Sequence, residues 1–123
     1  DKPWCRIQKE VGTSSWFTFG MVLDGELKGR RAEVVDALSK AGIQNRPLAS
    51  RNFLKQPVMR DLDFIVSGQM TAADDIHDNG FFVGNGSEDI RKNIKELYSI
   101  IRSFCKIKEP RGLGNVKRML IGK

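Results

Sequence analysis

No apolar run in this 123-residue sequence approaches the roughly 20 residues that a membrane-spanning helix needs. The sequence also holds a single histidine and only two cysteines, Cys5 and Cys105, which lie far apart without a CxxC pair. So sparse a set of ligands predicts no metal site and favours reduced thiols over a disulfide. Because a signal-peptide pattern is missing as well, we expect a cytoplasmic protein with no membrane partner.

Motifs that carry catalysis by themselves are missing too. The sequence has no glycine-rich phosphate loop, no nucleophile elbow and no paired-carboxylate arrangement. We therefore assign no catalytic residue, and we do not expect the chain alone to be a working enzyme.

The net charge of +6 is concentrated at the C-terminal end of the sequence. Residues 106–123 carry six basic side chains and one acidic one, whereas residues 1–105 carry 15 basic and 14 acidic ones. A nucleic-acid-binding domain usually has a basic face on its folded body, so this distribution does not favour nucleic acid as the partner. The basic tail, residues 106–123, leaves a second function class open: an interaction module that binds nucleic acid or an acidic surface.

The first half of the sequence predicts a strand, a helix and a second strand after a lead-in segment, residues 1–14, of loop character. The strand lies within 16–23, and its inward positions are expected to be Phe17, Phe19, Met21 and Leu23. The helix has apolar residues at helical spacing from Leu27 to Ala41, and Gly42 suits a left-handed C-terminal cap. The second strand, 43–48, contains Pro47, which confines it to a sheet edge.

The second half begins with an irregular stretch, 49–80, which is more often functional than idle at this length. It contains two expected helical turns, at 57–62 and at 71–78, the second with a Thr71–Asp74 capping box. A strand at 81–83 and a helix capped by Ser87 follow. The stripe expected to be buried on this last helix is Ile90, Ile94, Leu97, Tyr98, Ile101 and Cys105. The fold class predicted is α+β, with a small, mostly antiparallel sheet and helices packed on one face.

Three segments of the sequence resemble one known family. They are Gly42-Ile43-Gln44-Asn45-Arg46-Pro47, Asn52-Phe53-Leu54-Lys55-Gln56-Pro57 and His77-Asp78-Asn79-Gly80-Phe81-Phe82-Val83-Gly84-Asn85. They resemble the C-terminal small domain of the pyridoxal-phosphate-dependent aminotransferases and 3-dehydratases that act on nucleotide-linked sugars. The aminotransferases more often have a histidine shortly before Gln-Pro, and its absence near Gln56 places the sequence closer to the 3-dehydratases.

The resemblance implies a function within a larger enzyme. Residues 15–105 would be the small domain of a fold-type-I enzyme that makes deoxy or amino sugars for lipopolysaccharide O-antigen. Its partners would be a missing N-terminal domain that holds pyridoxal phosphate, a second subunit of a homodimer, and the nucleotide-sugar substrate. This chain itself would bind no cofactor.

The resemblance also supplies candidates for contacts with the sugar. Arg46 ends a strand just before a proline, and its guanidinium suits a phosphate, a carboxylate or a pair of hydroxyls. The other candidates for substrate binding are Arg51, Asn52, Lys55, Gln56 and Asn85. Similar 3-dehydratases commonly have glycine where Arg51 stands, so the backbone of this loop is expected to differ. His77 lies between carboxylates, and we interpret it as structural, hydrogen-bonded to Asp74.

Overall fold

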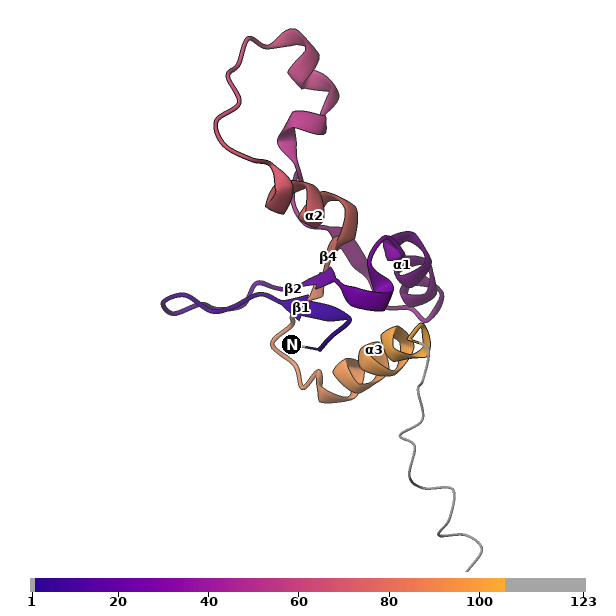
Figure 1. The fold of residues 1–123 in the computed structure, drawn as a ribbon. Helices are drawn as coiled ribbons and strands as arrows, with labels where there is room; N and C mark the ends of the chain where they lie inside the picture. Colours follow the sequence, from indigo (N-terminus) through magenta and orange to yellow (C-terminus); the bar gives the residue numbers. More distant parts are fainter. Residues whose placement is uncertain (1, 106–123) are drawn as a thin grey trace, which may run out of the picture.

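The protein is a four-stranded antiparallel sheet with three α-helices, described in a computed structural model for residues 2–105. The strands run in the order β1-β2-β4-β3 across the sheet, and each neighbouring pair is antiparallel (Figure 1). The predicted α+β class with a small antiparallel sheet is confirmed. The elements are β1 Cys5–Ile7, β2 Thr18–Leu23, α1 Arg31–Lys40, β3 Asn45–Pro47, α2 Thr71–Asn79, β4 Gly80–Gly84 and α3 Arg91–Ser103.

One face of the sheet forms the hydrophobic core with α1 and α3. Met21 of β2 lies opposite Phe81 of β4, so both side chains point to this face, and both are buried. Val34 and Leu38 of α1 complete the core together with Leu97 and other residues of α3. The side chains at alternating positions of β2 and those at helical spacing in α1 thus pack in the same core.

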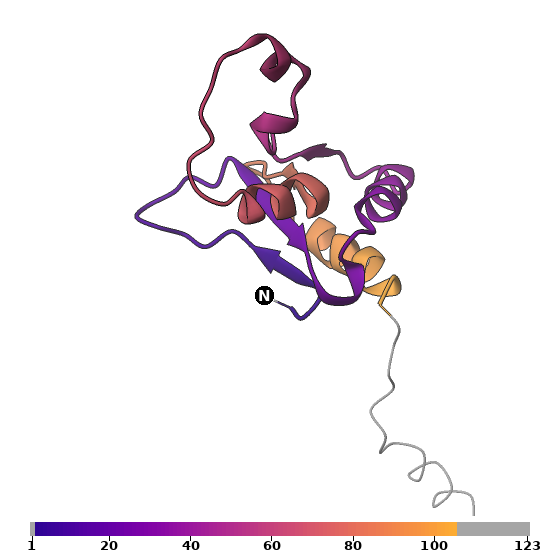
Figure 2. The same cartoon turned by 45° about the horizontal axis from the view of Figure 1, so that its top comes forward.

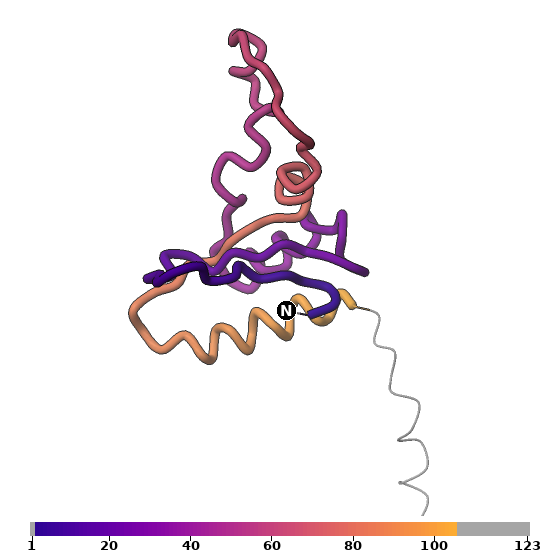
Figure 3. Tube along the Cα trace, turned by 60° about the vertical axis from the view of Figure 1, so that its left-hand side comes forward, coloured from indigo at the N-terminus to yellow at the C-terminus, as the bar shows by residue number. Residues whose placement is uncertain are grey.

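The opposite face of the sheet is covered by α2. Figure 3 shows the sheet between α3 on one side and α2 on the other. The approach is close at Gly80, where an added Cβ would lie 2.5 Å from the Ile76 carbonyl oxygen and 2.7 Å from Leu48 Cδ1. Glycine is therefore required where α2 turns into β4, and this contact holds α2 against Leu48, next to the edge strand β3.

Helix α1 ends as the sequence predicts. Gly42 has a φ of 80°, and its N–H donates to the Ser39 carbonyl at 3.0 Å. The N–H of Ile43 donates to the Leu38 carbonyl at 2.9 Å, which completes a Schellman motif. The motif turns the chain directly into β3, so the local glycine signal positions the edge strand.

Several predicted details are wrong. Neither Thr71 nor Ser87 caps a helix, because α2 and α3 begin after Met70 and Ile90 without a side-chain cap bond. Phe17 is 87% exposed, since β2 begins only at Thr18.

The ends of the domain hold two further corrections. The lead-in segment contains a strand, β1, which pairs with β2. On α3 the predicted stripe is buried at Leu97 and Ile101, whereas Ile94 and Tyr98 are exposed. Only the C-terminal half of α3 therefore packs closely on the core.

The irregular stretch forms an arm, residues 49–70, that extends away from the sheet (Figures 1 and 2). It holds two 3₁₀ turns, η2 Phe53–Lys55 and η3 Pro57–Asp61, the second starting with the predicted proline. The arm leaves six apolar side chains exposed: Phe53, Val58, Leu62, Phe64, Ile65 and Val66. Exposed apolar side chains gathered on one segment are uncommon on monomeric proteins.

A polar network fastens α2 to the N-terminal half of the chain. Asp75 accepts hydrogen bonds from Arg6 of β1 and from Asn79 Nδ2 at 2.9 Å, and it forms an ion pair with Lys28 at 3.2 Å. Asn79 is buried, and its Oδ1 accepts from the Gly29 N–H at 2.7 Å. Burial alone would raise the pKa of Asp75, but the hydrogen bonds from Arg6, Lys28 and Asn79 outweigh it and lower that pKa.

Replacing Asp75 by alanine is expected to lower the free energy of unfolding at pH 7 by about 1–3 kcal/mol, mostly because the buried Asn79 amide loses its acceptor. The folded-state pKa lies below the unfolded value, so this stabilisation is present above about pH 4 and is lost as the pH falls through the folded-state pKa. Urea unfolding at several pH values measures the difference between the two proteins, which should shrink on acidification. Asp36→Ala, which removes an exposed pair with Lys40, is the control and should cost at most about 0.5 kcal/mol.

Candidate functional site

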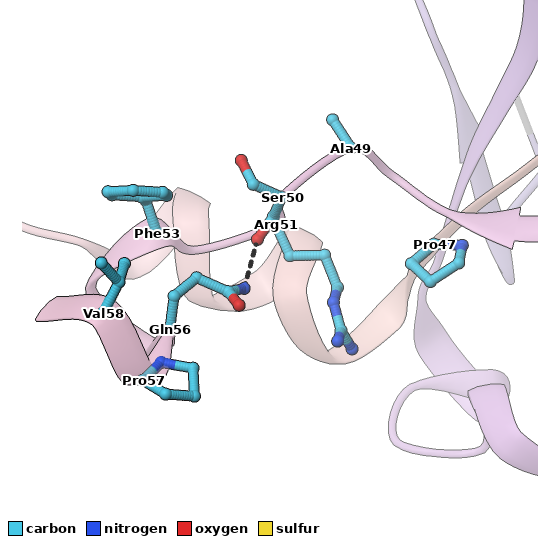
Figure 4. Close-up of a pocket in the computed structure, with 8 residues that line it drawn as sticks. All are labelled: Pro47, Ala49, Ser50, Arg51, Phe53, Gln56, Pro57 and Val58. Carbon is cyan, nitrogen blue, oxygen red and sulfur yellow. Dashed lines mark hydrogen bonds between the residues drawn. The ribbon is translucent and has the colours of Figure 1, made fainter.

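Two hollows lie at the β3 edge of the sheet, and they contain four of the six predicted substrate-binding residues. The arm hollow has a volume of about 390 Å³ and is lined by Pro47, Ala49, Ser50, Arg51, Phe53, Gln56, Pro57 and Val58 (Figure 4). The edge hollow, of about 470 Å³, contains both Arg46 and Asn85. The adjacent residues Arg46 and Pro47 join the two hollows.

Arg46 is placed in the edge hollow by the register of the sheet. It lies opposite Phe82 of β4, so its side chain shares a face with Phe82 and is exposed. Among residues 2–105 no hydrogen bond or ion pair engages its guanidinium, which is therefore available to a ligand. Asn85 closes the other side of the hollow, where its Nδ2 donates to the Trp16 carbonyl at 2.6 Å.

Asn52 and Lys55 fasten the base of the arm to α2. Asn52 is buried; its Oδ1 accepts from the Leu54 N–H at 3.0 Å, and its Nδ2 donates to Asp74 Oδ1 at 2.8 Å. Lys55 Nζ lies 2.8 Å from the same carboxylate oxygen. The hydrogen bonds from Lys55 and then Asn52 lower the pKa of Asp74. Both side chains thus have partners within the protein, in contrast to Arg46.

His77 does not form the predicted bond to Asp74, whose Oδ1 is engaged by Asn52 and Lys55. Its Nδ1 is buried without a hydrogen-bond partner in the part of the chain that the structure describes.

Arg51 has a left-handed backbone, with a φ of 58°. Glycine adopts this conformation freely, whereas other residues pay about 1–2 kcal/mol. The loop is held in shape by its neighbours: Gln56 Nε2 donates to the Ser50 carbonyl at 2.8 Å, and the Arg51 N–H donates to the Leu48 carbonyl at 2.9 Å. Arg51, which stands where similar 3-dehydratases commonly have glycine, therefore has a strained backbone.

Replacing Arg51 by glycine is expected to raise the free energy of unfolding by about 0.5–1 kcal/mol, because strain relief exceeds the entropy that the unfolded chain gains. Thermal unfolding measures the change. Ser50→Gly is the matched control, since Ser50 has no positive φ, and it should leave stability unchanged or lower it. A loss of stability in Arg51→Gly would show that the arginine side chain itself supports the loop.

Sequence reasoning missed a third hollow, of about 550 Å³, between the sheet and the N-terminal half of α3. Phe19, Ile43 and Val83 line it from the sheet side, and Ile94 of α3 lines it together with Ile90, which precedes the helix. It exists because this half of α3 leaves the sheet. The helical periodicity gave no sign of that departure.

Pyridoxal phosphate in an enzyme of the predicted fold type needs a cofactor-facing lysine or histidine and a carboxylate partner for the pyridinium nitrogen. All seven lysines between residues 2 and 105 are exposed, and the three hollows described above contain neither a lysine nor an aspartate. A further hollow, of about 490 Å³, is lined by Lys9 but by no aspartate or glutamate. These hollows therefore do not combine the groups that the cofactor needs.

Residues 2–105 also lack any group of three potential metal ligands. None of the helices in this range has the length and apolarity that crossing a bilayer requires. The alternative prediction of a basic interaction tail concerns residues 106–123, which lie outside the described residues.

No family model matches the chain. The chain is 41% identical over 101 residues to a GDP-4-keto-6-deoxy-D-mannose 3-dehydratase from Yersinia pseudotuberculosis, a match that covers 81% of this chain and 26% of the relative. It is 32% identical over 75 residues to the lipopolysaccharide biosynthesis protein RfbH from Salmonella typhimurium, a match that covers 61% of this chain and 17% of that protein.

A solved structure agrees with these sequence matches. The GDP-4-keto-6-deoxy-D-mannose-3-dehydratase of Escherichia coli, with bound hydrated pyridoxal phosphate, superposes with a TM-score of 0.74 at 34% identity, over 81% of this chain and 26% of the enzyme. The chain thus spans about a quarter of the length of the relatives that it matches, and the matching quarter is the C-terminal one. The resemblance read from the sequence is confirmed.

Proposed function

We propose that this chain, which is homologous to the C-terminal quarter of the GDP-4-keto-6-deoxy-D-mannose 3-dehydratases, covers the sugar-binding cleft of such an enzyme. The observation that carries the proposal is the identity of 41% combined with two open hollows at the β3 edge. The parent enzyme would remove the 3-hydroxyl of a GDP-linked 4-keto-6-deoxy sugar, on the way to lipopolysaccharide O-antigen.

The side chains divide into two roles under this proposal. Arg46, Arg51, Gln56 and Asn85 line the hollows and contact the nucleotide sugar. Asn52 and Lys55 act by holding the arm on α2, so that the contact groups stand in fixed positions. Fixed positions matter because contacts with the sugar speed its reaction only when they hold it in the reactive orientation.

The remaining three quarters of the parent would hold pyridoxal phosphate and the groups that catalyse its chemistry. The exposed apolar side chains of the arm provide a surface for that missing part or for the second subunit of a homodimer. The parent would work in the cytoplasm, where nucleotide sugars are made.

Complementation of a bacterial strain tests this function. A fusion enzyme, which joins the upstream three quarters of the Yersinia relative to this chain, is expressed in a strain that lacks its own 3-dehydratase. We expect restored O-antigen, seen as the lipopolysaccharide ladder on a gel. A fusion enzyme that is folded and abundant but leaves the ladder absent would refute the proposal.

The chain alone provides a second test. Adding it to pyridoxal phosphate should leave the absorbance spectrum of the cofactor unchanged, since under this proposal the groups that hold the cofactor belong to the upstream part of the parent. A saturable spectral change would show that this chain itself binds the cofactor and would contradict this part of the proposal.

A further inference from the structure

The third hollow, between the sheet and the N-terminal half of α3, has the character of a site for an apolar occupant. None of the residues that line its volume of about 550 Å³ is charged, and the polar side chains among them are the amides of Gln44, Asn85 and Asn93. Ile94 lines it and is 44% exposed, although it lies on the apolar stripe of α3. A space of this size with an apolar lining and a few polar groups is typical of a binding site. We call it the apolar hollow.

An aromatic residue is held in place beside the apolar hollow. Trp16 lines it from the loop before β2, with a backbone φ of 49°, a conformation that glycine adopts without strain and other residues rarely adopt. The Trp16 carbonyl accepts the hydrogen bond from Asn85 Nδ2, which fastens this loop to the end of β4. Strain that a tertiary contact maintains is more common at binding sites than elsewhere.

The described part of the chain ends at the opposite end of α3. Figure 3 shows α3 close to the sheet at this end and farther from it at the other. Arg30 Nη1 donates to the Phe104 carbonyl at 3.0 Å, so the chain leaves the core at a fixed place. Ile94 precedes Cys105 by 11 residues, a distance of roughly 16 Å along a helix. A later segment of the chain therefore has to return only this far to meet the apolar hollow.

The sequence beyond residue 105 is long enough for that return. The ten residues 106–115 can span roughly 33 Å when extended, about twice the distance needed. The excess allows for a reversal of the chain. Pro110, Gly112 and Gly114, which lie within this stretch, are residue types that turns use.

Residues 116–121 suit the apolar hollow by composition. Four of the six are apolar: Val116, Met119, Leu120 and Ile121. Positions 116, 119 and 120 have the spacing of one face of a helix, and Lys117 and Arg118 fall outside that face. An uncharged hollow can take up the apolar side chains while the two cations stay in water.

We propose that residues 116–121 of this chain bind in the apolar hollow. Their binding removes exposed apolar surface on both sides of the contact, which favours it. The apolar hollow shares Gln44, Gly84 and Asn85 with the edge hollow, so the bound segment supports the wall that lies across from Arg46. The proposal goes beyond the proposed function and does not depend on it, because the contact lies within the chain itself.

Nuclear Overhauser cross-peaks in the full chain test the contact. We expect cross-peaks between the methyl groups of Leu120 and those of Ile43 and Ile94. Leu120→Asn should abolish them and shift the indole signal of Trp16. Leu113→Asn is the matched control, because Leu113 lies in the basic tail but outside the proposed segment, and it should change neither signal. Missing cross-peaks in the unaltered chain, or equal losses in the two variants, would overturn the proposal.

A substitution in the apolar hollow tests the other side of the contact. Ile94→Asn changes an exposed position, so the fold should be kept, and the cross-peaks between Leu120 and Ile43 should weaken severalfold. Ile76→Asn is the control, since Ile76 is 39% exposed on α2, at the opposite face of the sheet. Circular dichroism checks that both variants remain folded. Full cross-peaks in a folded Ile94→Asn variant would take the apolar hollow out of the contact.

Other occupants give different results in the same measurements. In a mixture of chains labelled at leucine with chains labelled at isoleucine, cross-peaks that grow with concentration would show that a second copy fills the apolar hollow. Occupation that is seen only in the fusion enzyme would assign the apolar hollow to the upstream part of the parent. Either result would overturn the proposal. Failure of the proposed function is visible separately, because an inactive fusion enzyme leaves the cross-peaks of the isolated chain unchanged.

Discussion

Replacing Phe81 by alanine is expected to lower the free energy of unfolding by about 3–5 kcal/mol. Phe81 is 1% exposed and lies in β4, between β2 and β3, so its ring fills the centre of the core face. A domain of this size has roughly 5–15 kcal/mol of total stability. The variant should therefore lose a large part of its stability and unfold at much lower urea concentration, as followed by circular dichroism.

Phe64→Ala is the control for this substitution. Phe64 is 49% exposed on the arm, so truncating it in the isolated chain should change stability by at most about 0.5 kcal/mol. Similar losses in both variants would mean that the arm, rather than the sheet with α1 and α3, contributes the core.

Replacing Arg46 by alanine in the fusion enzyme is expected to lower kcat/KM for the GDP-linked sugar roughly 10- to 100-fold. Pro47 restricts the backbone of Arg46 to an extended form, and the guanidinium has no competing partner among the described residues. Arg46→Lys should retain part of the rate, since it keeps the charge but loses the fork geometry. Steady-state kinetics with each variant measures the effect.

Arg60→Ala provides the comparison for Arg46. Arg60 is exposed on η3 and lines neither hollow, so its removal should leave kcat/KM unchanged. An equal fall in the two variants would point to a general loss of positive charge. No fall in Arg46→Ala would take Arg46 out of the substrate site.

Parts of the fold that depend on neighbouring residues were predictable from the sequence. The alternation at Phe19, Met21 and Leu23, the stripe of α1 and the Gly42 cap each involve residues within a few positions, and each appears in the structure. Pro47 correctly predicts an edge strand, because proline cannot donate to a second neighbour.

The errors in the fold have tertiary causes. β1 is too short for a pattern, and it exists because β2 offers it a free edge. Ile94 is exposed although it matches the helical period, since α3 diverges from the sheet there. Thr71 is a residue type that suits an N-cap, but the chain arriving from the arm enters the helix one residue earlier, so Met70 occupies the N-cap position.

The six candidate substrate-binding residues stay predictions, but the structure separates them by their contacts. The resemblance directed attention to Arg46 and Arg51, and the structure leaves both guanidiniums available. It gave no reason to separate them from Asn52, whose partner Asp74 lies 22 residues away in the chain.

The rate of 3-dehydration by the purified fusion enzyme decides whether this chain completes a dehydratase. The rate is compared with that of the upstream portion of the Yersinia relative alone, at equal pyridoxal phosphate content. We expect turnover of GDP-4-keto-6-deoxymannose only when this chain is attached. A fusion enzyme that is folded, loaded with cofactor and no faster than the upstream portion would contradict the proposed function.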